Sequence, residues 1–504
     1  MPISRPRHLK RWLYIIHRWI GIFTCLLFAM WFISGLVMIY VPFPSLGQSE
    51  RLEGLPAIDW TRVHVEPAAA LATANVAVPK ALALEMEGDL PVWRITPWAG
   101  GESTISARDG SRLGPVGPAQ ARRIAAMFGH AEVREITRVE RDQWTVAGGF
   151  DRHRPLWKAK LAGPGGRVLY VSSRNGAVVL DTNARERFWN WLGSVPHWIY
   201  PTILRQDSAA WRQVVMWVSG PCIVGAMVGI WIGILRTRLG RRRFNDGRMI
   251  PYHGWMAWHH VTGLVGGLFL LGWIFSGWLS VDPFRLFAGA GVSEGGRIAY
   301  EKPGETPRLD LAALARGATG AKRVTLDWVD GRPLIEVERA GSPEATLSAA
   351  TLHPAAIPQE DLITAAMRLL PDVPIRSVQR LEAPDSYWYA VGDRPVLPVL
   401  RIKFADKAGT WVHIDPATGR FLGALDRRDR IYRWAFDLLH KWDLNVLTLN
   451  RPVWDIVLWL LSIVGLVTSV SGIWIGVLRL RHGKSASARS MRASPPGGAS
   501  KLPG

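Results

Sequence analysis

Four long apolar segments are separated by two much longer segments in which polar and apolar residues alternate over short distances. The first apolar segment contains one charged residue, Arg18, and the other three contain none. Each segment is long enough to cross a hydrocarbon core as a helix, which requires about 20 apolar residues. The pattern therefore predicts an α-helical integral membrane protein with four transmembrane helices, over residues 13–41, 214–235, 261–281 and 456–478.

The two long polar segments show a common order of short strands and one helix, which predicts two external α+β domains. In the first segment, Asn175-Gly176 is a strong signal for a hairpin turn. Its predicted strands are 92–96, 104–107, 156–161, 168–171 and 177–180, and its helix is 119–128. In the second segment the strands are 323–327, 334–338, 399–404, 411–414 and 421–422, and the helix is 358–370.

The two halves of the chain repeat one unit. His17 begins HRWIG and His259 begins HHVTG, and each is followed at the same spacing by a Ser-Gly pair, in FISG and IFSG. His197 precedes GIWIGILR by the count that separates His440 from GIWIGVLR. Self-similarity at this scale indicates a tandem internal repeat of span, α+β domain and span. Histidines kept at matching membrane-edge positions suggest haem ligands, since an ionisable group there is a candidate functional residue.

The positive charge is concentrated in three short pieces. The net charge is +20, and the residues that flank the first span, fill the loop between the second and third spans and follow the fourth span hold 16 of it. Basic residues next to spans remain on the cytoplasmic side. We therefore expect both termini to be cytoplasmic and both polar segments to be external, and nucleic-acid binding is the weaker interpretation of the charge.

These patterns together predict an order of parts along the chain. They are a cytoplasmic N-terminus with the first span (1–41), an external domain with an interfacial segment (42–211), the second span (212–236), a basic cytoplasmic loop (237–258), the third span (259–281), a second external domain with an interfacial segment (282–454), the fourth span (455–478) and a disordered basic tail (479–504).

Only two cysteines occur, Cys25 and Cys222, and both fall inside predicted spans. This excludes an external fold held by disulfides and a cysteine-rich zinc or iron–sulfur site. The chain contains no CxxCH, the motif for covalent haem attachment, so any haem must be held noncovalently.

Two stretches resemble a known family. WVHIDPATGRFLG at 411–423 resembles the closing hairpin of a PepSY domain, and HRWIG with FISG resembles the first span of PepSY-associated transmembrane proteins. The resemblance covers nearly the whole chain, although the first copy reads VLYVSSRNGAVVL where the second has its DPATG turn. It implies two periplasmic PepSY-like domains, a bacterial inner-membrane location and two b-type haems held by histidines. The family includes reductases that deliver electrons to ferric siderophores.

Depth predicts how the histidines pair. His17 and His259 lie at the cytoplasmic ends of their spans, whereas His197 and His440 lie on the external side, about 30 Å away. One iron cannot bridge that distance, so we expect one haem between His17 and His259 and another between His197 and His440. His260 is a competing ligand for His259, but Arg18 occupies its place in the first copy and its helix face is turned by about 100°.

Small residues follow the histidines along the spans, as at Gly21 and Gly35 after His17. They would let a flat macrocycle lie against the backbone, or serve close helix–helix contacts. The remaining external histidines are expected to be surface residues; they are His64, His130, His153, His353 and His413.

The expected function is electron transfer from the cytoplasmic side through both haems to a periplasmic acceptor, with ferric iron in a siderophore as the expected substrate. No GxGxxG unit is present for a nicotinamide or flavin, so the donor is expected to be a separate cytoplasmic flavoprotein or a membrane quinol. Two other classes stay open. A transporter would also show duplicated spans but should carry carboxylates at mid-membrane, and a non-redox anchor with PepSY domains that bind or regulate a partner would not need the histidines.

Overall fold

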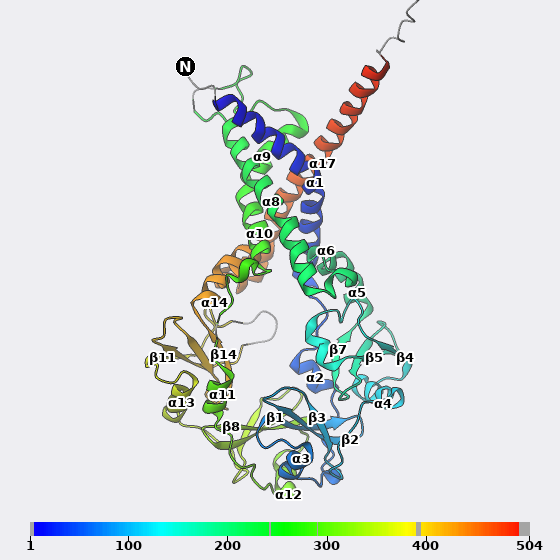
Figure 1. Ribbon diagram of the computed structural model, residues 1–504, viewed down its shortest axis with the longest axis vertical. Coiled ribbons are helices and arrows are strands. Elements are labelled where there is room, and N and C mark those ends of the chain that lie inside the picture. Colours follow the sequence, from blue (N-terminus) through cyan, green and yellow to red (C-terminus); the bar gives the residue numbers. More distant parts are fainter. Residues whose placement is uncertain (1–4, 241–242, 290, 390–394, 493–504) are drawn as a thin grey trace, which may run out of the picture.

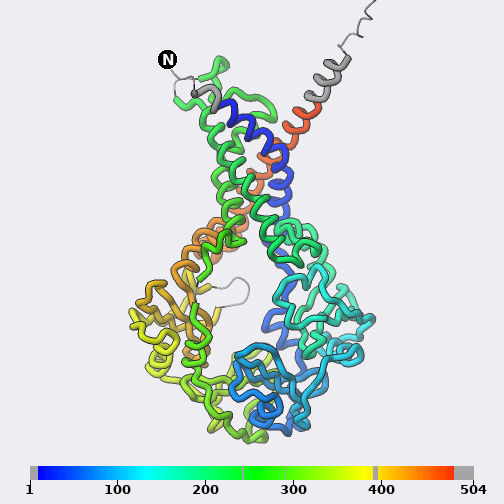
Figure 2. The backbone as a smooth tube through the Cα atoms, in the orientation of Figure 1, coloured from blue at the N-terminus to red at the C-terminus, as the bar shows by residue number. Residues whose placement is uncertain are grey.

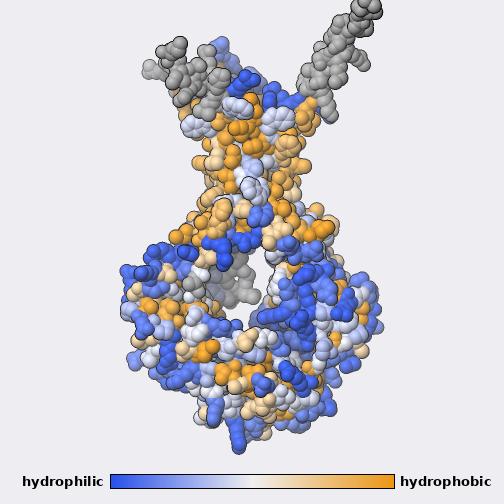
Figure 3. Space-filling model, viewed as in Figure 1, coloured by the Kyte–Doolittle hydropathy of each residue, from blue (hydrophilic) through white to orange (hydrophobic). Residues whose placement is uncertain are grey.

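A bundle of long helices stands on a broad base of sheets (Figures 1 and 2). The computed structural model describes residues 5–240, 243–289, 291–389 and 395–492. Three of the described helices are long and apolar enough to cross a membrane, namely α1 (Arg5–Tyr40), α8 (Ser208–Arg236) and α17 (Arg451–Arg492). Apolar residues cover the bundle while hydrophilic residues dominate the base (Figure 3). The chain is therefore a membrane protein with additional sheet-containing domains.

The third apolar segment differs from the single helix that its composition predicts. It forms α9 (Gly254–Val265) and α10 (Gly267–Leu279), which meet at an angle of 63°. A Cβ on Gly266 would lie 2.6 Å from Val464 of α17, and one on Gly267 would lie 2.7 Å from Ile230 of α8. The bend thus lies where two glycines let neighbouring helices approach the backbone, a common site of helix kinks.

The fourth apolar helix is longer than expected. Helix α17 continues past residue 478, where the span was predicted to end, and runs to Arg492. Residues 493–504 of the predicted disordered tail lie outside the described residues.

The two external segments share their central sheet. It has six antiparallel strands in the order β10 (Ala345–Ser348), β9 (Arg332–Glu338), β8 (Arg323–Val329), β1 (Pro79–Glu87), β2 (Leu90–Pro97) and β3 (Ser103–Ser106). The β1–β8 pairing joins the two copies, with Leu82 opposite Leu326 and Glu85 opposite Arg323. Both halves contribute buried apolar residues to one core beneath this sheet. The external segments are therefore fused through a joint sheet and core.

Each copy also has its own four-stranded antiparallel sheet. The first has the order β4 (Val133–Val139), β5 (Leu156–Leu161), β6 (Val168–Ser172) and β7 (Val178–Thr182), and α4 (Pro118–Gly129) packs on it. The second has the order β11 (Ile375–Leu381), β12 (Val399–Phe404), β13 (Trp411–Ile414) and β14 (Phe421–Leu425), and α13 (Gln359–Ala366) packs on it. The two sheets lie on opposite sides of the base (Figure 1), and the space-filling view shows an opening in the base (Figure 3).

The strands with clear apolar patterns lie where the sequence predicts them. Strands β5, β12 and β13 have the predicted bounds, and Gly176 makes the predicted hairpin turn between β6 and β7 with a positive φ. Four strands were not predicted, namely β1, β4, β10 and β11. Three of these lie at sheet edges, where a strand needs little apolar surface, and β1 is rich in the helix-forming residues Ala, Leu and Glu.

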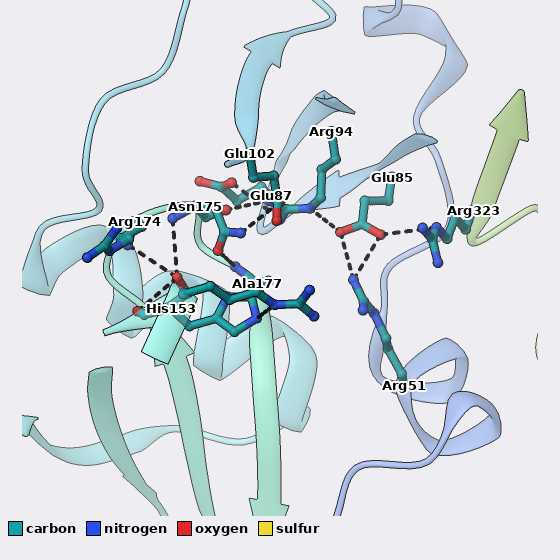
Figure 4. A network of polar contacts seen from close by, with 12 residues as sticks. Arg51, Glu85, Glu87, Arg94, Glu102, His153, Arg174, Asn175, Ala177 and Arg323 are labelled. Carbon is teal, nitrogen blue, oxygen red and sulfur yellow. Dashed lines mark hydrogen bonds and ion pairs between the residues drawn. The ribbon is translucent and has the colours of Figure 1, made fainter. Parts of the chain in front are cut away.

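A buried polar network ties the central sheet to the first four-stranded sheet (Figure 4). Arg94 of β2 forms ion pairs with Glu85 and Glu87 of β1 and donates to the backbone carbonyl of Asn175, in the β6–β7 turn. Arg51 also contacts Glu85, at 3.2 Å. Because these charges are buried, each depends on its partners for stability.

Candidate functional site: two histidine pairs at two depths of the bundle

The sheet-distal pair consists of His17 on α1 and His259 on α9. Their ring centroids are 6.2 Å apart, and the rings are inclined at 43°. Nδ1 of His17 lies 3.1 Å from the carbonyl oxygen of Gly225 on α8, and Nδ1 of His259 lies 2.9 Å from that of Thr468 on α17. Because a carbonyl can only accept, each Nδ1 carries the proton and donates it, which leaves the Nε2 lone pair available.

The sheet-proximal pair consists of His197, at the end of α6 (Ser194–His197), and His440, on α15 (Leu439–Lys441). Their ring centroids are 6.0 Å apart and the rings are inclined at 74°. Nδ1 of each histidine lies 3.0 Å from a serine hydroxyl, Ser34 for His197 and Ser276 for His440. The serines belong to the repeated FISG and IFSG sequences, so the repeat places equivalent partners beside equivalent histidines.

Two tryptophans orient the backbone of the sheet-proximal pair. The indole of Trp31 donates to the carbonyl of His197, and that of Trp273 donates to the carbonyl of His440, both at 3.0 Å. Burial holds the pKa of His197 at about 3 and that of His440 at about 4. Both imidazoles are therefore neutral at physiological pH, which is the form that binds a metal.

The ring spacing of both pairs is that of two imidazoles that would hold one haem iron between them. Two metal–imidazole bonds of about 2.0 Å, plus the distance from each nitrogen to its ring centre, place the centroids of axial imidazoles roughly 6 Å apart. Among the described residues, none makes a hydrogen bond to Nε2 of any of the four histidines, so all four nitrogens can serve as ligands. Nδ1 hydrogen bonds of this kind fix the orientation of metal-binding histidines.

A glycine faces every one of these four imidazoles. A Cβ built on the glycine would lie between 2.6 and 3.4 Å from Cε1 of the ring, for the pairs Gly229–His17, Gly472–His259, Gly35–His197 and Gly277–His440. The sequence pattern indicated that small residues admit a macrocycle or close helix contacts. The structure shows that these four glycines seat the histidine rings of neighbouring helices.

The two pairs occupy different levels of the bundle. His17 and Gly35 lie on the continuous helix α1, and Gly35 faces His197, so a rise of about 1.5 Å per residue separates the levels by roughly 27 Å. Aromatic residues lie between the levels, since Phe28 and Phe32 stand between His17 and Gly35 along α1 and belong to the buried apolar core of the bundle. Phe32 lies edge-on to Trp273, with ring centroids 5.6 Å apart, and Trp273 packs against this core.

His260 does not join either pair. Its Nε2 lies 3.0 Å from the hydroxyl of Thr237, and its ring centroid lies 5.2 Å from that of Tyr252.

The expectation that the external histidines lie on the surface is wrong for two of them. His413 is fully buried and its Nε2 accepts a hydrogen bond from Arg401, while His153 is 8% exposed.

Several residues at the site were not predicted as part of it. Phe436 stacks on His440 at 5.1 Å and 21°, and the backbone of Thr468 holds His259. The serines and glycines beside the rings carried a signal in the sequence, because Ser34-Gly35 and Ser276-Gly277 are kept in both copies. Phe436 carried none, since Gly193 occupies its place in the first copy.

Comparison with known proteins identifies one family. The family described as the PepSY-associated TM region matches residues 14–321, which is more than half of the chain. No curated protein matches the chain.

Proposed function

This chain belongs to the PepSY-associated TM region family, and on that premise we propose that it is a di-haem electron-transfer protein of the bacterial inner membrane. It reduces a periplasmic acceptor, ferric iron held in a siderophore. The observation that carries the proposal is the duplicated arrangement of the histidines. Two pairs, each contributed by both copies, have the spacing of axial ligands and lie at two depths of an apolar bundle.

When bound, haem supplies a reversible one-electron carrier at each level. The protein holds each imidazole neutral, directs its Nδ1–H to a carbonyl or hydroxyl and leaves Nε2 for the iron. Apolar and aromatic residues of the bundle core lie between the levels. With these roles the chain keeps two carriers at fixed positions across a membrane.

The charge pattern supports one direction through the membrane. The basic loop between α8 and α9 lies at the end of the bundle far from the sheets (Figure 1). Under the positive-inside rule that end is cytoplasmic and the sheets are periplasmic. A separate cytoplasmic flavoprotein or a membrane quinol would then supply the electron at the end of the bundle where His17 and His259 would hold one haem. At the other end, one electron converts Fe³⁺ to Fe²⁺, which hard oxygen ligands hold less strongly.

The haem content of the purified protein tests the proposal. Protein from haem-supplied cells should contain two haems per chain and show a reduced-minus-oxidised visible spectrum of the b type. The double variant His197→Ala with His440→Ala should retain one haem, as should His17→Ala with His259→Ala. His260→Ala is the matched control and should retain both.

Two results would contradict the proposal. Absence of haem from the well-folded wild-type protein would favour a non-redox membrane anchor whose external domains bind a partner. Unchanged haem content in both double variants would show that the histidine pairs are not the ligands.

A further inference from the structure

Each of the two four-stranded sheets carries a polar cluster at the equivalent position of its copy. In the first copy Asp142 binds Lys158 at 2.8 Å and Tyr170 at 2.7 Å. In the second copy Arg401 binds Asp385 and, at 2.9 Å, His413. In both copies the aspartate lies in the loop between the first two strands of the sheet. It binds a basic residue of the second strand, which faces Tyr170 or His413 on the third strand. These contacts are therefore part of the shared scaffold.

The copies diverge at the next residue on that face. In the first copy the position is Val168, which is buried in an apolar cluster. In the second it is Trp411, which is only partly buried and has three cations over its ring. The charged groups of Arg401, Lys403 and Arg430 lie 5.0, 4.4 and 4.1 Å from the ring centroid.

Lys403 adds uncompensated charge to this face. Its counterpart Lys160 forms an ion pair with Glu135 on the adjacent strand at 2.8 Å, whereas Ser377 lies opposite Lys403. Within the described part of the chain, no carboxylate pairs with Lys403. Burial, together with nearby arginines that include Arg401, lowers the pKa of Lys403 although Asp385 opposes this effect. Because it has no ion-pair partner among the described residues, Lys403 leaves an unpaired positive charge beside the Trp411 ring.

A series of aromatic rings leads from this face toward the sheet-proximal pair. Tyr387 lies edge-on to Trp411 at 5.2 Å and to Trp434 at 6.2 Å, and the indole of Trp434 donates to the Tyr387 hydroxyl. Trp434 belongs to the short π-helical segment Arg433–Leu438, which also carries Phe436, and Phe436 stacks on His440.

The first copy keeps only the middle of this series. Trp144 and Trp191 lie edge-on at 6.1 Å, as Tyr387 and Trp434 do, but Val168 and Gly193 replace the rings at the two ends. Aromatic rings at both of these end positions therefore occur in the second copy alone.

We infer that the face around Trp411, Lys403 and Arg430 is the docking site for a small, multiply anionic ferric chelate, which takes its electron from the His197–His440 level. The inference rests on the proposed function. Carboxylate or catecholate oxygens of the chelate match the charged groups of Lys403 and Arg430, since Arg401 is buried and already paired with Asp385. Two cations gathered beside one ring cover the area of a small ligand, whereas a stable protein partner covers about 800 Å² per side.

The electron count is simple. The chelate's Fe³⁺ gains one electron and becomes Fe²⁺, and the carrier held by His197 and His440 loses one. The donor on the other side of the membrane then restores the carrier.

Binding can be measured without any redox step. Gallium(III) citrate is anionic and redox-inert, and titration calorimetry on the full-length protein reports its affinity. We expect Lys403→Gln to weaken binding about tenfold, since one charge-assisted contact is lost. Trp411→Val, which introduces the residue of the first copy, should weaken it as well. Lys160→Gln is the matched control and should leave the affinity within about twofold, because Lys160 is already paired.

The redox step provides a second readout. Stopped-flow oxidation of the reduced protein by ferric citrate at saturating concentration should slow in Trp411→Val and remain at the wild-type rate in Lys160→Gln.

Three outcomes would overturn the inference. The first is an equal affinity of the wild type and Lys403→Gln for gallium citrate, and the second is no binding to the wild type. The third is displacement of gallium citrate by glycerol phosphate at a concentration below that of the citrate complex, which would assign the face to lipid headgroups. The proposed function fails separately, through absence of haem, and loss of chelate binding with both haems retained would refute this inference alone.

Discussion

At the scale of single residues, the missing side chains of four glycines set the positions of the four imidazoles. The closest approach is at Gly229, where a Cβ would lie 2.6 Å from Cε1 of His17. Contacts that short force the ring or the helix to move, and inserting a methyl group into a packed interior costs about 1–3 kcal/mol. The glycines, together with the hydrogen bonds to Nδ1, therefore determine where the imidazole rings lie.

We expect Gly229→Ala to displace His17 and to reduce the haem content at the sheet-distal level, while the sheet-proximal haem remains. Gly220→Ala on the same helix is the control, since nothing lies within 4 Å of a Cβ at that position. Haem quantification and electron paramagnetic resonance of the low-spin iron would measure both. Equal spectra for the two variants would mean that Gly229 does not seat the ligand.

At the scale of elements, the central sheet carries buried carboxylates with opposite electrostatic environments. Glu85 on β1 is surrounded by Arg94, Arg51 and Arg323, and despite the cost of burial these cations lower its pKa to about 2. On β9, burial and the nearby Asp327 raise the pKa of Glu336 to about 8, although Arg420 opposes the shift. Ionisation of Glu85 should therefore stabilise the folded protein, whereas ionisation of Glu336 should destabilise it.

For Glu336 the folded state binds the proton more tightly than the unfolded chain, so stability should fall as pH rises from about 4.5 through 8. Glu336→Gln should flatten this decline and raise the melting temperature at pH 8 relative to wild type. Thermal unfolding of the detergent-solubilised protein at several pH values would show it. A wild-type slope unchanged by the substitution would contradict the assignment.

Glu85→Gln is the corresponding test for the other buried carboxylate of the central sheet. The carboxylate of Glu85 stabilises the fold above about pH 4.5, and this contribution is lost as pH falls through 2. Its removal leaves the buried Arg94 with fewer partners and should cost about 3–5 kcal/mol at pH 7. The same unfolding measurements would detect this loss, and a variant as stable as wild type would refute it.

At the scale of the whole molecule, the β1–β8 pairing closes the two external segments into one unit below the bundle. Each copy therefore contributes to both histidine pairs at the top and to a joint sheet at the bottom. The two copies therefore contact each other both in the bundle and in the central sheet.

The orientation of the molecule can be tested by labelling. Arg108 lies in the external segment and Arg243 in the basic loop, and both are exposed. In intact spheroplasts a membrane-impermeant maleimide should label Arg108→Cys and leave Arg243→Cys unlabelled until the membrane is opened. Background labelling should be small, because Cys25 and Cys222 are buried. The reverse pattern would invert the proposed direction of electron transfer.

Local patterns along the chain were enough to predict the apolar segments, the repeat and strands such as β5 and β12. They also identified the four histidines that recur at matching positions in both copies. These features depend on hydrophobic period and on neighbouring residues, which a sequence displays directly. Contacts between distant residues determined the rest. The bend at Gly266, the burial of His413 and the sheet shared by β1 and β8 all arise from packing between segments far apart in the chain, and no local pattern encodes such packing.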